Sequence, residues 1–334
     1  MRFWTFRTSR IGRAVRILVG LVGLSLCLGL SGCGGSSPGS ETLTLLAPAA
    51  PGGGWDQTAR VMQQVFRSTE LAPRAQVVNV PGAGGVIGLA RVVSSHEGDA
   101  NLLIMTGLIM MGAILTNESP VTMKQVTPIA RLLGEYEVLV VPAESPHRTL
   151  AEFVTAWKSD PGALAIAGGS AGGTDHMLAG LLAIAVGVEV TEINYLPHSG
   201  GGESLASLLG SHVAAGINGY AELIPFIEAG RLRPLGISSE ERVAGLDVPT
   251  FREQGVEVSL ANWRAVAAPP GITDDERSNL VALMDRMHAS GAWKDALEQN
   301  KWFDLYLTGS EYESFLEQED ARVVAVLQSI GLVD

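Results

Sequence analysis

Short apolar runs alternate along this chain with longer segments in which apolar residues recur at helical spacing. The run at 43–46 is typical of a buried strand. The pattern after it places Ala59, Met62, Val65 and Phe66 on one face of a helix. Strands and helices continue to alternate towards the C-terminus. This alternation predicts a mostly parallel sheet covered by helices, and therefore an α/β fold.

The same periodicity sets the bounds of the expected elements. We expect further strands at 76–80, 101–106, 127–132, 137–141, 163–167, 190–195, 212–217 and 233–237. We expect helices at 85–95, 109–115, 150–159, 177–186, 203–209, 221–229, 273–290, 292–299 and 310–330. Thr149 is a good N-cap for the helix at 150–159, and Glu152 stands at the third helical position, as in a capping box.

Glycine-rich turns follow several of these strands. Pro48 and Pro51 end the first strand, and the sequence then reads GGGWD. Glycines expose backbone N–H groups, and the first turn of a helix leaves its N–H groups unpaired and partially positive. Similar turns occur at 81–88, 168–176 and 198–203. Together the four turns predict a shared pocket for a negatively charged group, bound without cationic side chains.

The first 32 residues have the layout of an export signal. Five arginines precede an apolar stretch at 17–30, which is too short for a good membrane-spanning helix. Leu-Ser-Gly-Cys at 30–33 resembles a bacterial lipobox, which predicts a lipoprotein signal peptide at 1–32 and lipid attachment to Cys33. Residues 33–40 read as a flexible tether. An ordinary signal peptide with an incidental cysteine is the alternative.

Charge and cysteine content narrow the possible partners. Losing five arginines and no acids with the signal would take the formal charge from −12 to −17. Such an acidic chain is not expected to bind nucleic acid or anionic lipid surfaces, because like charges repel. Cys27 would leave with the signal and Cys33 would carry the lipid, so no disulfide or thiol chemistry is expected in the fold.

Several blocks of the sequence, in order, resemble the tripartite tricarboxylate transporter substrate-binding (Bug-type) family. They are PGGGWDQTAR, NVPGAGGVIG, GGSAGGTDHMLAG, YLPHSGGGE, GRLRPLGIS, DVPTF and NWRAVAAPPG. The PGGGWD and PHSGGGE forms are most similar to the tricarboxylate-binding branch.

The resemblance implies a two-domain periplasmic-binding-protein fold of type II-like architecture, with the ligand cleft between the domains. Domain 1 would comprise 41–140 plus 265–334, and domain 2 would comprise 141–264. Crossing segments near 135–141 and 262–267 would form the hinge.

The resemblance also implies the chemistry of the site. Gly53 and Gly54 would donate N–H groups from the first domain. Ser170, Gly173 and Thr174 would be donors from the second domain. His198 and Ser199 occupy a turn where many relatives have lysine and glycine after the tyrosine.

Other residues are candidates for the lining of the cleft. Thr106 ends a strand, and Asp56 would either order its glycine turn or stabilise a helix N-terminus. His176 and His198 are better placed as hydrogen-bonding groups than as metal ligands, because their spacing with His212 matches no zinc pattern. Tyr220 and Trp263 are either cleft walls or core residues, and we expect walls.

Two sequence patterns suggest other activities. Gly168–Gly172 matches the G-x-S-x-G nucleophile elbow around Ser170, and Asp247 and His288 follow as candidate triad partners. The helix, however, is delayed to Thr174 instead of starting directly after the serine. The glycines at 81–88 have a loose dinucleotide-type spacing but lack the acidic residue that would hold a ribose.

The sequence therefore predicts an extracytoplasmic solute-binding protein of the cell envelope, held to a membrane only by its lipid. It would capture a di- or tricarboxylate as a monomer, without cofactor, metal or catalysis, and pass it to integral membrane subunits. An exported serine esterase using Ser170 and a carboxylate-sensing receptor subunit are the alternatives.

Overall fold

The computed structural model describes residues 42–243 and 245–334 of the 334-residue chain. The expected signal peptide at 1–32, the tether at 33–40 and the lipidation site Cys33 lie outside the described residues. Within the described ranges, no helix is both long enough and apolar enough to cross a membrane.

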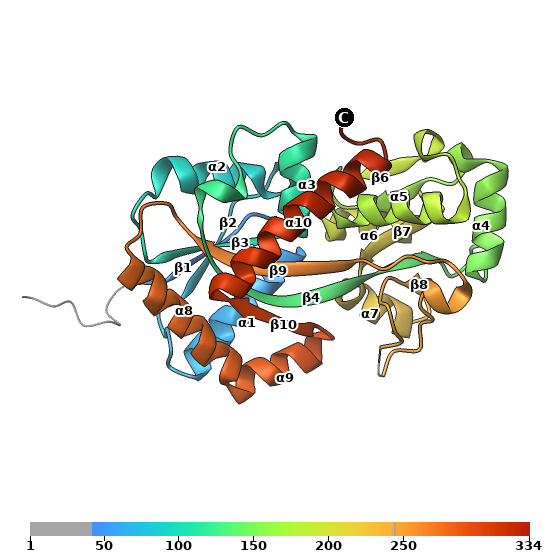
Figure 1. Cartoon of the computed structure of the whole chain (residues 1–334). Helices are drawn as coiled ribbons and strands as arrows, with labels where there is room; N and C mark the ends of the chain where they lie inside the picture. The colour runs from blue at the N-terminus through green and yellow to red at the C-terminus, as the bar shows by residue number, and fades with distance from the viewer. Residues whose placement is uncertain (1–41, 244) are drawn as a thin grey trace, which may run out of the picture. The chain divides into compact units, whose positions relative to one another are not determined.

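The strands of the described residues form one connected network (Figure 1). They are β1 (Thr44–Ala47), β2 (Gln76–Asn79), β3 (Leu102–Gly107), β4 (Thr127–Pro142), β5 (Ile166–Gly168), β6 (Tyr195–Pro197), β7 (Ala215–Gly219), β8 (Leu232–Ile237), β9 (Ala261–Ala268) and β10 (Phe303–Thr308). Their order is β2-β1-β3-β9-β4-β7-β5-β6, and β8 and β10 also pair with β4.

The centre of the sheet is antiparallel, so the prediction of a mostly parallel sheet is wrong there. β1 is parallel to β2 and β3, and β5 is parallel to β6 and β7. By contrast, β9 runs antiparallel to both β3 and β4, and β4 runs antiparallel to β7, β8 and β10. Two parallel α/β halves are thus joined through two long antiparallel strands.

Helices agree with the sequence more closely than strands do. They are α1 (Gly54–Ser68), α2 (Val86–Ser95), α3 (Leu108–Thr116), α4 (Leu150–Ser159), α5 (Thr174–Val186), α6 (Gly201–Leu209), α7 (Tyr220–Glu228), α8 (Asp274–Ala289), α9 (Gly291–Asn300) and α10 (Gly309–Ser329). The four apolar residues predicted on one face of α1 are all buried. Thr149 caps α4, where its Oγ1 accepts the Glu152 N–H at 3.2 Å.

β4 is one continuous 16-residue strand where the sequence predicted two. Its residues 127–136 pair with β9, and its residues 137–142 pair with β7 and β8. Gly134, between the two expected strands, does not break the strand; an added Cβ there would overlap the Leu305 side chain of β10. Figure 1 shows β4 and β9 side by side, with β1–β3 at one end and β6 and β7 at the other.

Other strand predictions were incomplete. β9 and β10 were not predicted as strands. The strand expected at 190–195 is instead a 3-10 turn, η4 (Val190–Glu192), followed by the short β6. In this turn the Glu192 N–H donates to the Glu189 carbonyl at 3.1 Å, so this N–H cannot pair with a neighbouring strand.

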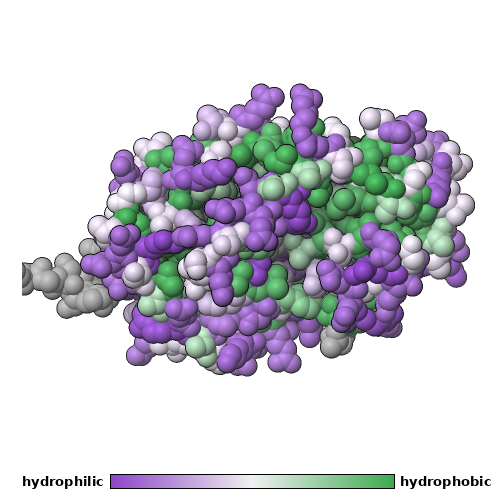
Figure 2. Space-filling model, in the orientation of Figure 1, coloured by the Kyte–Doolittle hydropathy of each residue, from purple (hydrophilic) through white to green (hydrophobic). Residues whose placement is uncertain are grey.

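Three apolar clusters form the core. The first packs α1 and α8 against β1 and β3, and the third packs β4 and β8 against α6 and α7. The second lies around α3, α5 and β9, and it includes Tyr312, Val323 and Leu327 of α10. On the face drawn in Figure 2, polar and apolar residues are interspersed.

Candidate functional site

A pocket lies where the glycine-rich turns meet the centre of the sheet. It holds about 670 Å³ of empty space, its solvent-open mouth included. Its lining is Pro48, Ala49, Gly53, Gly54, Trp55, Gly82, Gly84, Gly85, Ile109, Glu137, Gly169, Ser170, Asp175, Ser199, Gly200, Gly201, Asn218, Gly219, Glu222, Asn262 and Arg264. We call Gly53, Gly54, Gly82, Gly84 and Gly85 the glycine wall. We call Glu137, Asp175 and Glu222 the acidic wall.

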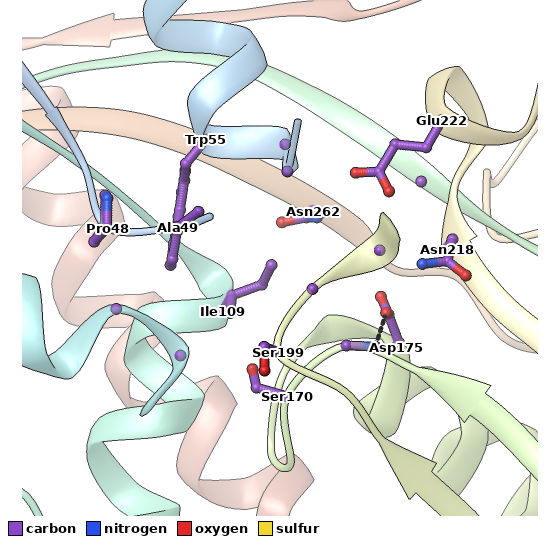
Figure 3. Close-up of a pocket in the computed structure, with 18 of the residues that line it drawn as sticks. Pro48, Ala49, Trp55, Ile109, Ser170, Asp175, Ser199, Asn218, Glu222 and Asn262 are labelled. Atoms are coloured by element: carbon purple, nitrogen blue, oxygen red, sulfur yellow. Dashed lines mark hydrogen bonds between the residues drawn. The ribbon is translucent and has the colours of Figure 1, made fainter. Parts of the chain in front are cut away.

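Four predicted ligand-binding residues line this pocket: Gly53, Gly54, Ser170 and Ser199. Figure 3 shows Ser170 and Ser199 close together, opposite the N-terminus of α1. The turns after β1, β2, β5 and β6 therefore do share one pocket. That these residues hold a ligand remains a prediction.

Asp56 organises the first glycine turn from outside the pocket. Its carboxylate accepts the Gly52 N–H, the Arg60 Nε–H and an Asn79 Nδ2–H, each at 2.8 Å. Burial alone would raise the pKa of Asp56, but these hydrogen bonds, led by that from Arg60, hold it below the ordinary value. Of the two roles expected for Asp56, ordering the turn fits these contacts.

The third glycine turn, before α5, uses several of its N–H groups internally. The Gly169 N–H donates to Asp175 Oδ2 at 2.6 Å. The Gly173 N–H donates to the Ser170 carbonyl at 2.9 Å, so Gly173 has no free N–H for a ligand. The expectation that Gly173 donates to a ligand is therefore corrected, and of the three donors expected in this turn only Ser170 lines the pocket.

His176 and His198 also face the protein. His176 Nδ1 accepts the Gly172 N–H at 3.2 Å, and its ring stacks on Tyr195 at 4.0 Å between centroids. Burial lowers the pKa of His176 to about 4, which keeps the ring neutral. His198 Nε2 lies 2.7 Å from Ser207 Oγ. Neither histidine lines the pocket.

Four further predicted residues lie outside the pocket lining. Thr106 and Thr174 are buried. Tyr220 is half-buried at the start of α7. Trp263 is 2% exposed and donates from Nε1 to Glu319 at 2.9 Å, which makes it a core residue and not a cleft wall.

The acidic wall and its neighbours were not predicted as site residues. Glu135 and Glu137 are fully buried in the middle of β4, and Arg264 is buried in β9. Arg264 forms an ion pair with Glu135, whose other oxygen accepts the Ala221 N–H at 3.2 Å. The signal was available: charged residues interrupt two otherwise apolar segments, LLGEYEVLVV and ANWRAVAA. A charge buried in a central strand needs a partner or a function.

The three carboxyls of the acidic wall resist ionisation. Burial, and then the charges of Asp175, Glu135 and Glu222, raises the pKa of Glu137 well above its ordinary value. Burial raises the pKa of Asp175 to about 6, against the opposing effect of the Gly169 N–H. Burial, followed by the charge of Glu135, raises the pKa of Glu222 to about 8. Like charges in a desolvated site explain all three shifts.

Several pocket glycines are needed because side chains fill the space beside them. A Cβ on Gly54 would overlap the Arg264 guanidinium, and a Cβ on Gly201 would overlap the Glu222 carboxylate. These glycines therefore leave space for charged side chains of the protein itself, a role that was not predicted from the sequence.

The candidate esterase triad is not assembled. His288 Nε2 pairs with Asp304 at 2.8 Å, and Asp247 lies 3.5 Å from Arg242. α5 begins at Thr174, beyond the two glycines that follow Ala171. In the described part of the chain, no group of three His, Cys, Asp or Glu residues is placed to hold a metal ion.

Known proteins resemble this chain in sequence and fold. A family model described as tripartite tricarboxylate transporter family receptor matches residues 58–332. The "UPF0065 protein in gbd 5′ region" of Cupriavidus necator is 29% identical over 294 residues, which is 84% of this chain and 85% of that protein. A TctC solute-binding protein from Polaromonas, solved without ligand, has 27% identity and a TM-score of 0.64 over 88% of this chain and 99% of its own.

Two further structures contain ligands. Rpa4515 of R. palustris with adipate has 23% identity and a TM-score of 0.80, over 87% of this chain and 97% of its own. MatC of Rhodopseudomonas palustris with bound malate has 23% identity and a TM-score of 0.74, over 86% of this chain and 98% of its own. The expected α/β periplasmic-binding-protein fold is confirmed.

Proposed function

This chain belongs to the tripartite tricarboxylate transporter receptor family, and from that premise we propose that it captures a small organic carboxylate for such a transporter. The family resemblance expected from the sequence is confirmed, and the family consists of extracytoplasmic solute-binding receptors, not enzymes. The ligand, the membrane partner and the lipid anchor belong to the proposal.

The observation that carries the proposal is the pocket between the glycine turns. Its glycine wall includes the first residue of α1, whose N-terminus is partially positive. Adipate and malate in two structures of the same fold support a di- or tricarboxylate ligand here. A citrate-like ligand remains the finer expectation from the tricarboxylate-binding branch.

Closure of two domains would bury the ligand. We assign 41–140 plus 265–334 to domain 1 and 141–264 to domain 2. β4 leaves its pairing with β9 after Tyr136, and β9 begins at Ala261, opposite the same residue. A hinge at these two crossings would let the walls separate without breaking either parallel half of the sheet.

Attachment through Cys33 would keep the receptor, as a monomer, beside its integral membrane subunits. The motif at 30–33 supports this, and radiolabelled palmitate incorporation by wild type and Cys33→Ser tests it. Labelling of wild type alone is expected. Equal labelling of both proteins, or of neither, would remove the lipid anchor from the proposal.

A thermal-shift screen tests the ligand class. The purified protein is heated with citrate, other polycarboxylates, dicarboxylates, amino acids and sugars. An acid present at 100 times its Kd should stabilise the protein by about 2.7 kcal/mol. A shift with a sugar and with none of the acids would contradict a carboxylate ligand.

Two controls separate the alternatives. Ester hydrolysis that is abolished in Ser170→Ala would favour the esterase. A pull-down that recovers a signalling protein in place of transporter subunits would favour the sensor. For a receptor, Ser170→Ala should weaken acid binding by about tenfold through loss of one hydroxyl donor.

A further inference from the structure

The pocket lining has more acidic than basic side chains. Arg264 supplies the positive charge among the described lining residues, and its ion pair with Glu135 already uses that charge. Among the described residues, Glu137, Asp175 and Glu222 then form no ion pair. A ligand that brings only further negative charge would add to an unbalanced site.

Individual acceptor atoms on the acidic wall lack donors. Glu137 is fully buried; its Oε1 accepts from Asn262 Nδ2 at 2.9 Å, its Oε2 receives no N–H donor from the described residues, and its carboxyl can share a proton with the neighbouring Asp175. Glu222 accepts no hydrogen bond from the described part of the chain, and Figure 3 shows its carboxylate directed into the pocket towards Asp175 and Asn218. Glu222 is half-buried, and a partly desolvated carboxylate without a donor is costly, so it requires a donor from the ligand or from solvent.

The chain makes specific room for one of these carboxylates. Glu222 Oε2 lies against the α-carbon of Gly201, at the position that a Cβ would occupy. The Asn218 amide lies beside the same position, fixed by the Ser204 hydroxyl that donates to its oxygen at 2.9 Å. The carboxylate of Glu222 is therefore positioned by packing against Gly201, and no hydrogen bond from the described residues fixes it.

The opposite wall has the reverse character. The glycine wall and the adjoining Pro48, Ala49 and Trp55 carry no ionisable side chain. They surround the first residue of α1, where N–H groups and the helix dipole favour a negative group. The pocket is therefore polarised, with a donor-rich neutral wall facing an acceptor-rich acidic wall.

We propose that the ligand is an amino carboxylate, with its carboxylate on the glycine wall and its protonated amine on the acidic wall beside Glu222 and Glu137. The proposal rests on the proposed function of this pocket as a receptor site for a small acid. An ammonium group has three donors and no acceptor, which suits a wall of carboxylates that lack donors. A metal ion is a weaker fit, because no metal-ligand cluster occurs among the described residues.

Protons are the competing source of positive charge. If the acidic wall is protonated when the ligand binds, its carboxyls become donors and a plain dicarboxylate fits. The two cases differ in the sign of proton linkage: an ammonium releases protons from the wall, whereas a dianion takes protons up.

The experiment compares acids that differ only by an amine. Isothermal titration calorimetry at pH 7 is run with succinate against aspartate, glutarate against glutamate, and adipate against 2-aminoadipate. Each titration is repeated in phosphate and in Tris, whose ionisation enthalpies differ, to count protons. In at least one pair, the amino acid should bind about 100-fold tighter than its partner and release protons.

Glu222→Gln is the matched variant, since it keeps the shape of the side chain and removes its charge. It should weaken the amino acid at least tenfold and leave the plain diacid unchanged or tighter. Glu228→Gln, at the exposed end of the same helix, should bind like wild type. Circular dichroism and the melting temperature of ligand-free Glu222→Gln confirm that it folds.

The outcomes are separable. Plain diacids that bind as tightly as the amino acids, or that take up protons, would overturn the amino-carboxylate proposal while leaving the receptor function intact. Binding of no acid of either kind would overturn both.

Discussion

Two helix N-termini of this protein have the same local sequence pattern and opposite electrostatics. In α1, glycine at the N-cap is followed at the third helical position by Asp56; in α7, Gly219 is followed in the same way by Glu222. Asp56 accepts hydrogen bonds from three partners, and its pKa is lowered. Glu222 accepts none from the described residues, and its pKa is raised to about 8.

The difference comes from the strands behind each helix. β2 brings Asn79 to Asp56, whereas β4 brings Glu135 and Glu137 close to Glu222. The helix dipole favours both carboxylates equally, so it cannot explain the contrast. A local motif therefore identifies the acid, and tertiary neighbours decide whether that acid is structural or available to a ligand.

The largest expected effect is at Arg264, which lies between the two walls. Arg264→Met would leave Glu135 buried without its ion-pair partner and should lower the free energy of unfolding by about 3–5 kcal/mol. Urea denaturation at pH 7 measures this loss. Adding Glu135→Gln should restore more than half of it, because the unpaired charge is then gone. A double variant no more stable than Arg264→Met would contradict the pairing argument.

The second prediction concerns pH and the acidic wall. Glu222 has a folded-state pKa of about 8 against an ordinary 4.5, so the folded protein binds more protons between these values. Its contribution to stability is complete below pH 4.5 and is lost as pH rises to about 8. With partial solvent exposure allowed for, that loss is on the order of 2–4 kcal/mol.

Glu222→Gln isolates this contribution. Measured by urea denaturation of ligand-free protein from pH 4.5 to pH 9, the variant should gain stability relative to wild type as pH rises. Asp175 and Glu137 titrate with the same sign in both proteins, so the difference between the curves reports Glu222 together with its charge coupling to these two acids. Parallel curves would mean that the Glu222 carboxyl is solvated and not part of the desolvated wall.

The sequence predicted the helices and the glycine turns better than it predicted the strand pairing and the contacts within the pocket. Helix bounds followed from apolar periodicity and caps, because these are local properties, as at Thr149 and Glu152. The antiparallel pairing of β4 and β9 did not follow, since it joins residues more than a hundred positions apart. The glycine turns were placed correctly in one pocket, but their role as space for Arg264 and Glu222 depends on tertiary contacts.

Among the site residues, too, some were predicted correctly from local sequence and others were not. Ser170 and Ser199 were found from their turns, and both line the pocket. Trp263 was expected in a wall of the cleft, yet β9 buries it against α10. Glu137 was not proposed at all, although a charge inside an apolar run was the available signal.

The third prediction uses two adjacent glycines of α6. A Cβ on Gly201 would overlap the Glu222 carboxylate, whereas a Cβ on Gly202 meets nothing within 4 Å. Gly201→Ala should displace the end of Glu222 and weaken ligand binding about tenfold in calorimetry, with the fold retained because a flexible side chain can move. Gly202→Ala should bind normally and gain about 0.5–1 kcal/mol of stability from helix propensity. Equal binding by both variants would remove Glu222 from the site.

The smallest expected effect is at Asp56, the fully partnered counterpart of Glu222. Asp56→Asn keeps an acceptor for the Gly52 N–H but loses the charge that pairs with Arg60, and should cost about 1 kcal/mol at pH 7. Because the folded-state pKa of Asp56 is lowered, its contribution is present above the ordinary value of 3.8 and is lost as pH falls below it. The difference from wild type should therefore shrink below pH 3.8, opposite in sign to the trend for Glu222→Gln. If the two variants follow pH in the same direction, the contrast between a structural acid and a ligand-facing acid fails, since both carboxyls would then have the same surroundings.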